Sequence, residues 1–193
     1  MPYVCDGLSV GVLIFDEHNR MLMITRANAP VGIAPVAGHV RDENPEYTHA
    51  DAAVVETEEE VGLTVAREDL VSVYSRWHGN RCGAQVPAPS LGHDWGVFRA
   101  KKWSGQVQEA PDEVRAAHWY DLDQVQGLAD RTVSYAHGLI SEEEWQRFPG
   151  LEPVWVDIFS ITPAPGDPGR MMVNLPDPRD LGPVRDLYST PPV

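Results

Sequence analysis

The sequence predicts an α/β (α+β) fold, because runs with the composition of strands alternate with stretches of helical spacing. The runs at 8–15 and 20–26 are apolar and rich in Val, Leu and Ile, which is typical of strands. The stretches at 49–61 and 122–136 have helical spacing instead. With 193 residues, of which 42% are hydrophobic, the chain is long enough to bury one sizeable core.

The first part of the chain is expected to form three strands. Residues 16–20 (DEHNR) supply turn chemistry between the first two strands, so we expect these two to pair as a hairpin. A loop at 29–35, with two prolines and a glycine, leads into a third strand at 33–40.

The helix at 49–61 is bounded by residues that begin and end helices. Thr48 and Asp51 have the spacing of an N-terminal capping pair. Gly62 follows the last helical residue, where a left-handed conformation ends many helices.

Three glutamates share one side of this helix. At about 100° per residue, Glu56, Glu59 and Glu60 converge, whereas Glu58 points elsewhere. At about 6 Å, each like-charged pair costs on the order of 0.7 kcal/mol in water and about 3 kcal/mol at an effective dielectric of 20. A divalent cation would remove this repulsion, and oxygen ligands favour Mg²⁺ or Mn²⁺. The alternative is a solvated acidic surface.

The stretch 38–63 (GHVRDENPEYTHADAAVVETEEEVGL) resembles the box of the Nudix hydrolase (MutT-like) family, G-x5-E-x7-R-E-U-x-E-E-x-G-U, with U a bulky apolar residue. The matching residues are Gly38, Glu56, Glu59, Glu60, Gly62 and Leu63. The resemblance implies a Nudix-type α/β/α sandwich with a mixed β-sheet. It also implies a Mg²⁺-dependent pyrophosphohydrolase that cleaves a diphosphate linkage in a nucleoside triphosphate, nucleotide sugar or dinucleotide.

The sequence departs from the family pattern in three ways. Val55 stands at the position of the box arginine, Thr57 stands at the first U, and the segment after Gly38 is three residues longer. The early box glutamate is therefore Glu43 or Glu46. In the family the arginine helps to hold the glutamates. Val55 and Thr57, in place of the expected residues, therefore favour an alternative function, a nucleotide-sensing module that binds without turnover.

The resemblance also assigns residues outside the helix. The backbone carbonyl before the box glycine, here that of Ala37, would join the three helix glutamates as a metal ligand. An extra glutamate from a loop before a late strand would reach the metal or act as a base. Glu113 is the first candidate for this role and Glu109 the second.

Candidate substrate-binding residues lie on strands. Arg26, at the end of the second strand, could contact a substrate phosphate, or it could be a solvated arginine at a loop mouth. In the strand expected at 95–103, alternation places Trp95 and Arg99 on one face. A nucleobase could stack there beside a cation; the alternative is an ordinary half-exposed strand.

The long loop at 78–93 is a candidate substrate-selecting flap. A zinc site made of His78, Cys82 and His93 is a weaker alternative, because this spacing fits no familiar metal motif. The two cysteines, Cys5 and Cys82, are expected to be free thiols, with a disulfide or a mixed Cys/His metal site as the alternatives.

The remaining elements follow from spacing and capping signals. We expect strands at 69–77, 113–122 and 154–161, and helices at 122–136 and 141–148. Proline supplies 8 of the last 32 residues, so no regular packing is expected for them. We therefore assign 1–161 to one domain and 162–193 to a tail that lies across this domain or across the partner in a homodimer.

The formal charge of −14 argues against binding a nucleic-acid duplex, which requires clustered Lys and Arg. A small nucleotide-type substrate is the expected partner instead. Residues 1–6 are short and polar, unlike a signal peptide, and no apolar run is long enough to span a bilayer. We therefore expect a cytoplasmic protein without membrane contact.

Overall fold

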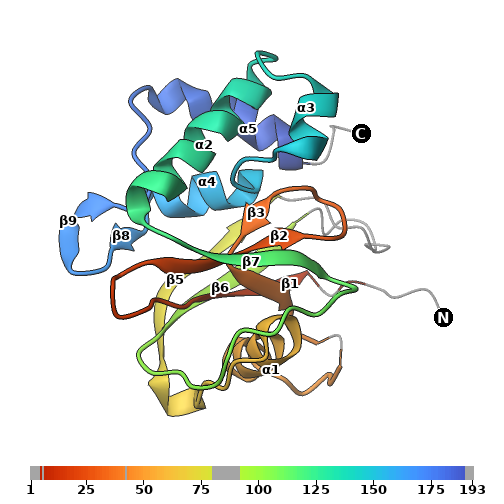
Figure 1. Cartoon of the computed structure of the whole chain (residues 1–193), viewed down its shortest axis with the longest axis vertical. Helices are drawn as coiled ribbons and strands as arrows, with labels where there is room; N and C mark the ends of the chain where they lie inside the picture. The colour runs from red at the N-terminus through yellow and green to blue at the C-terminus, as the bar shows by residue number, and fades with distance from the viewer. Residues whose placement is uncertain (1–4, 6, 42, 80–91, 190–193) are drawn as a thin grey trace.

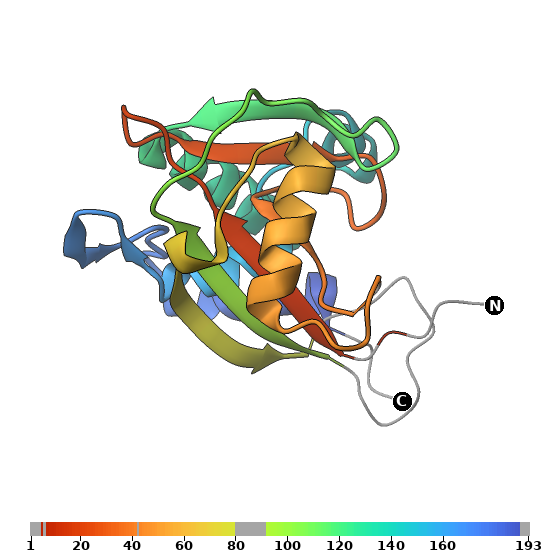
Figure 2. The same cartoon turned by 90° about the horizontal axis from the view of Figure 1, so that it is seen from below.

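The computed structural model describes residues 5, 7–41, 43–79 and 92–189, and its elements form three layers (Figure 1). The strands occupy the middle layer. Helix α1 (His49–Val61) covers one face, and Figure 2 shows it lying in front of the strands. The other face is covered by the helices α2 (Leu122–Ala136), α3 (Glu142–Arg147), α4 (Pro153–Ser160) and α5 (Leu181–Tyr188). The predicted α/β/α arrangement is therefore confirmed.

Two sheets make up the middle layer. The larger has the strand order β4-β1-β6-β5, in which β1 runs parallel to β6 and antiparallel to β4, so the sheet is mixed as predicted. The smaller has the order β3-β2-β7. The strands are β1 (Leu8–Leu13), β2 (Met21–Arg26), β3 (Ile33–Ala34), β4 (Val36–His39), β5 (Leu70–His78), β6 (His93–Ala100) and β7 (Val114–Tyr120).

The first two strands do not form the expected hairpin. They enter different sheets, because β1 pairs with β4 and β6 whereas β2 pairs with β3 and β7. The turn itself forms, since the N–H of Asp16 donates to the carbonyl of Arg20 at 3.0 Å. An isolated bridge joins Phe15 to Met21, and beyond it the two strands pair with different partners.

Helix α1 has the predicted bounds and caps. The side chain of Thr48 accepts from the N–H of Asp51 while the Asp51 carboxylate accepts from the N–H of Thr48. Gly62 ends the helix with a φ of 67°. The buried residues of the helix are Ala52, Ala53, Thr57, Glu60 and Val61. One carboxylate is therefore carried into the interior among apolar neighbours.

The predicted strand at 154–161 is wrong, because this segment forms the helix α4. Pro153 stands in its first turn, and every residue from there to Phe159 is buried. A helix enclosed between a sheet and other helices is apolar all round, so its sequence shows no period that would distinguish it from a buried strand. Trp155 packs on β1, where a Cβ on Gly11 would come within 2.2 Å of its ring.

The expectation that the tail lacks regular packing is also wrong for its described part. After α4 come the two short strands β8 (Pro163–Ala164) and β9 (Asp167–Met171), the 3-10 helix η2 (Pro178–Asp180) and α5. Helix α5 packs against α4 and α2. Several tail side chains join the core between the sheet and the helices, namely Met172, Val173, Val184 and Tyr188.

In the described ranges no helix is both long and apolar enough to cross a membrane.

Candidate functional site

A cavity of about 140 Å³ opens where the end of β2, strand β4, helix α1 and the loop before β7 meet. It brings together six residues that sequence reasoning singled out, from four separate parts of the chain. The lining residues are Arg26, Asn28, Ala37, Gly38, His39, Glu56, Glu60 and Glu113.

Glu60 is the buried carboxylate of this site. Its side chain is only 4% exposed, and one of its oxygens accepts the N–H of Ala37 at 3.0 Å. Burial raises the pKa of Glu60 to about 8, because the charged form loses its hydration. The Ala37 N–H and the nearby Arg26 lower this pKa, and Glu113 raises it further. Near neutral pH the carboxyl group therefore holds a proton unless a cation replaces it.

Glu56 is placed by a glycine on the neighbouring strand. A Cβ on Gly38 would lie 1.9 Å from Oε1 of Glu56 and 2.1 Å from its carboxyl carbon. These distances are far below any real contact, so the absence of a side chain at position 38 lets the carboxylate rest on the strand. This is a close approach that a glycine uniquely permits.

Glu59 lies at the exposed edge of the same cluster. Burial, and then the neighbouring Glu43 and Glu113, raise the pKa of Glu59. Of the two candidates for the early glutamate, Glu43 lies beside Glu59, and the backbone N–H of Glu46 donates to Oδ1 of Asn44 at 3.0 Å. Glu113 reaches the cluster because its loop is held by the bond from the N–H of Ala27 to the Glu113 carbonyl at 2.8 Å.

The donors of this site suit a hard divalent cation. Burial raises the pKa values of Glu59 and Glu60, and the negative charge of Glu113 raises both further. All of these donors are oxygens, the ligand type that Mg²⁺ and Mn²⁺ prefer. The three helix glutamates could hold the ion, with the carbonyl of Ala37 on the adjoining strand within the same cavity.

The family model described as NUDIX domain matches residues 6–141 of the chain. The chain belongs to the NUDIX family. This match covers well over half of the sequence and includes every residue of the acidic cluster. No curated protein matches the chain significantly.

Solved structures similar to this NUDIX chain include a MutT NUDIX hydrolase from Burkholderia pseudomallei, with 25% identity, a TM-score of 0.46, and coverage of 64% of this chain and 85% of that one. A MutT protein from Methanosarcina mazei Go1 has 18% identity and a TM-score of 0.49, covering 65% and 83%. The NUDIX domain of Shewanella oneidensis NrtR, complexed with ADP ribose, has 15% identity and a TM-score of 0.49, covering 61% and 74%.

The departures of this NUDIX box have different structural consequences. Thr57 is fully buried, but its hydroxyl donates to the carbonyl of Ala53 at 2.7 Å, so this hydroxyl is satisfied within the helix. Val55 is half-buried and brings no charge to the glutamates. A positive charge comes instead from Arg26, which lowers the pKa of Glu60 across the cavity.

Sequence reasoning missed Glu152, the residue that precedes α4. It is 7% exposed, and one of its oxygens lies 3.9 Å from Nη1 of Arg26. Burial raises the pKa of Glu152, and Arg26 opposes this. The parallel bridge between Ile33 and Leu151 carries Glu152 to this position. No local signal marks it, since the contact joins residues more than one hundred positions apart.

Two predicted substrate residues do not reach the cavity. Trp95 is 5% exposed and packs edge-on against Trp155, with ring centroids 5.3 Å apart. Its ring therefore has no free face for a nucleobase. Arg99 pairs with Leu13 and Val71 on the strands either side, and alternation places it on the sheet face of Trp95, opposite to α1.

The loop predicted as a flap falls mostly at 80–91, outside the described residues, and Cys82 lies there too. The two histidines of the proposed zinc trio have separate partners. His78 is bonded to Tyr74 and lies 3.6 Å from Asp157, whereas His93 lies 3.0 Å from the sulfur of Cys5.

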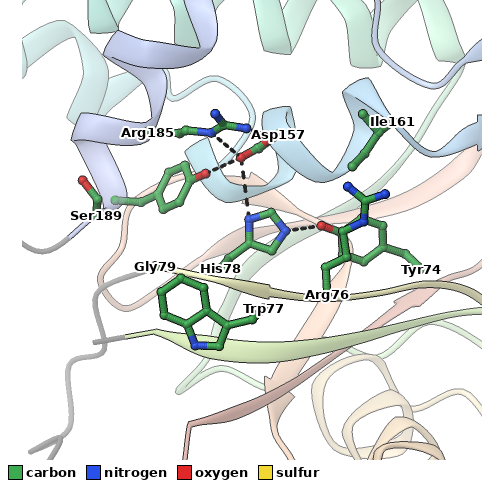
Figure 3. Close-up of a pocket in the computed structure, with 10 residues that line it drawn as sticks. Tyr74, Arg76, Trp77, His78, Gly79, Asp157, Ile161, Arg185 and Ser189 are labelled. Atoms are coloured by element: carbon green, nitrogen blue, oxygen red, sulfur yellow. Dashed lines mark hydrogen bonds and ion pairs between the residues drawn. The ribbon is translucent and has the colours of Figure 1, made fainter. Parts of the chain in front are cut away.

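A second cavity, of about 390 Å³, lies between β5, α4 and α5 (Figure 3). Beside it, Asp157 accepts two bonds from Arg185, at 2.7 and 2.9 Å, and one from the hydroxyl of Tyr188 at 2.7 Å. Burial acts to raise the pKa of Asp157, but the bonds from Arg185 and Tyr188 outweigh it and hold the pKa below its usual range. His78 approaches the same carboxylate and is also bonded to Tyr74. This network fastens α5 to α4 and β5.

Proposed function

We propose that this NUDIX-family protein is a metal-dependent pyrophosphohydrolase that cleaves a diphosphate linkage in a nucleoside diphosphate joined to another group. The observation that carries the proposal is the convergence of Glu56, Glu60 and Glu113 with Arg26 around one cavity. Carboxylates suit a cation, and the arginine suits a phosphate. A nucleoside triphosphate, a nucleotide sugar and a dinucleotide all contain such a linkage.

Each residue of the acidic cluster has a role in this proposal. Glu56, Glu59 and Glu60 would hold Mg²⁺ or Mn²⁺ together with the carbonyl of Ala37. When bound, such an ion neutralises phosphate charge and lowers the pKa of a water molecule. Glu60 must lose its proton to become a ligand, so we expect metal binding to release a proton and to strengthen as the pH rises.

A carboxylate that is not engaged as a ligand would take the proton from the attacking water. Glu113 suits this role because it is exposed at the edge of the cavity and comes from a loop rather than from α1. Glu56 is the alternative. Arg26 would bind a phosphate of the substrate, since it lines the same cavity as Glu56, Glu60 and Glu113.

A second candidate function is nucleotide binding without turnover. It is favoured by Val55, which leaves the box without its usual arginine. In that case the acidic cluster would still bind a cation and the cation would bind a nucleotide. The attacking water, however, would not be oriented.

One experiment distinguishes the two functions. Phosphate and pyrophosphate release is measured from a panel of nucleoside triphosphates, nucleotide sugars and dinucleotides, with and without Mg²⁺ or Mn²⁺. We expect metal-dependent release that falls by at least about 100-fold in Glu59→Gln and in Glu60→Gln. Glu58→Gln is the matched control, because Glu58 lies on the same helix but helical spacing points it away from Glu56 and Glu60.

Full activity in both Glu59→Gln and Glu60→Gln would refute the hydrolase assignment. If no substrate turns over but nucleotides bind in the presence of metal, the protein is a sensing module. Turnover that does not require a divalent ion would show that the acidic cluster has another role.

A further inference from the structure

Three potential metal ligands from distant parts of the chain meet beside the acidic cluster. They are Cys5 before β1, His39 at the end of β4 and His93 at the start of β6. One ligand atom of each lies within 4.8 Å of the others. Cys5 Sγ is 3.0 Å from Nε2 of His93, and the rings of His39 and His93 have centroids 5.4 Å apart.

The spacing of these atoms suits a tetrahedral zinc ion. With a Zn–S bond of about 2.3 Å and a Zn–N bond of about 2.0–2.1 Å, tetrahedral ligands lie roughly 3.6 Å apart. The observed 3.0 Å and the limit of 4.8 Å lie on either side of this value. Small rotations of the side chains would therefore complete the geometry.

The sulfur of Cys5 lies in a buried position. Its side chain is 1% exposed, and the N–H of Gly7 donates to Sγ at 3.3 Å. His93 is likewise buried, at 2% exposed. A buried thiolate requires positive charge nearby, and a metal ion supplies more of it than a backbone N–H does. Outer hydrogen bonds of this kind orient metal ligands in many proteins.

We propose that Cys5, His39 and His93 bind a Zn²⁺ ion, separate from the ion assigned to the glutamates. The two sites differ in the ion that they prefer, because thiolate and imidazole ligands favour borderline-soft ions whereas carboxylates favour Mg²⁺. The ion fastens Cys5 to the end of β4 and to the start of β6. It also fixes His39, the residue directly after Gly38, at the edge of the cavity.

The test uses the full-length protein without a polyhistidine tag, because a tag would itself bind zinc. Metal content is measured after loading with Zn²⁺ and extensive dialysis against buffer containing excess Mg²⁺. We expect about one retained zinc per chain. Replacement by Co²⁺ should give a thiolate-to-cobalt charge-transfer band together with the strong visible bands of a tetrahedral site.

Two variants test the ligands. Cys5→Ser should lose the charge-transfer band, and Cys5→Ser and His39→Asn should each weaken zinc binding by at least about 10–100-fold. His39→Asn keeps the test valid if the buried serine prevents folding, since His39 is half-buried. His18→Asn and Glu60→Gln are the controls. His18 has a side chain 67% exposed at the β1–β2 turn, so both controls should retain zinc.

Three results would overturn the proposal. The first is the absence of retained zinc in the wild-type protein. The second is a charge-transfer band that persists in Cys5→Ser. The third is zinc that is displaced by Mg²⁺ or lost in Glu60→Gln, which would place the ion at the glutamates. None of these readouts depends on hydrolase activity, so this proposal can fail while the proposed function stands.

Discussion

The carboxylate of Glu56 rests against the Cα of Gly38, at a separation that leaves no room for even one methyl group. The contact joins α1 to β4 and sets the position of a proposed metal ligand. We predict that Gly38→Ala displaces this carboxylate and lowers kcat/KM by about 100-fold, since an error of roughly 1 Å in a catalytic group costs about that much. Stability should change little, because the atom in conflict is the end of a flexible side chain.

The matched control is Gly127→Ala in α2. A Cβ there would meet nothing within 4 Å, and alanine stabilises a helix interior by roughly 0.5–1 kcal/mol relative to glycine. This variant should be fully active and slightly more stable by thermal unfolding. Wild-type activity in Gly38→Ala would contradict the placement of Glu56.

Because the pKa of Glu60 is raised, the stability of the metal-free protein should fall as the pH rises toward about 8. Its folded pKa is about 8 against 4.5 for an ordinary glutamate. Between these values the folded state holds a proton that the unfolded state has lost, so the free energy of unfolding falls as the pH rises. The slope is at most about 1.4 kcal/mol per pH unit. Urea unfolding with a chelator, at about pH 6 and about pH 7.5, should show a loss approaching roughly 2 kcal/mol.

Glu60→Gln isolates this effect, because glutamine cannot ionise but can still accept the N–H of Ala37. In this variant the free energy of unfolding should fall much less as the pH rises. Burial lowers the pKa of His78 and gives a slope of opposite sign, but this contribution is common to both proteins. If the free energy of unfolding depends equally on pH in the wild type and in Glu60→Gln, the carboxyl group of Glu60 is not held in its protonated form.

Arg26 is predicted to bind the substrate rather than to stabilise the fold. Arg26→Gln removes a charge-assisted hydrogen bond to phosphate, worth about 1.5–3 kcal/mol, so KM should rise by about 10- to 100-fold. Arg20→Gln, at the exposed β1–β2 turn, is the control and should leave KM unchanged. If Arg26→Gln instead lowers stability at constant KM, the arginine serves mainly to neutralise Glu152.

Asp157 should matter for stability and not for catalysis. Asp157→Asn leaves Arg185 without its partner, which costs about 3–5 kcal/mol for a fully buried pair. Because the Arg185 side chain is 54% exposed, we expect about 2–3 kcal/mol in urea unfolding. Arg170→Gln breaks the exposed pair with Asp123 and should cost less than about 1 kcal/mol. An unchanged free energy of unfolding in Asp157→Asn would contradict the anchoring role.

The acidic helix was predictable because its signals are local. Thr48, Asp51 and Gly62 lie within a turn of the ends that they fix, and helical spacing alone brings Glu56 and Glu60 to one side. These signals predicted the bounds of α1, and the family pattern pointed to Ala37 and Glu113, which the fold does bring to the cavity.

The remaining features depend on contacts between distant segments. Glu152 meets Arg26 only because β3 bridges to the start of α4, and Trp95 is buried only because α4 covers its face of the sheet. The strand predicted at 154–161 failed for the same reason, since a segment enclosed on every side has no polar face to reveal its period. Likewise, turn residues at 16–20 specify a reversal of the chain but not the sheet that each strand joins.

The family match ends at residue 141, yet the core that supports the sheet continues into α4, Met172 and α5. The inherited motif and the cooperative folding unit therefore have different lengths. A fragment cut at the boundary of the motif would keep every glutamate of the acidic cluster and the helix α2, but it would remove α4 and α5 from the face of the sheet that they share with α2. Evolution can alter the motif residue by residue, but losing the segment after residue 141 would remove part of the interior on which the motif rests.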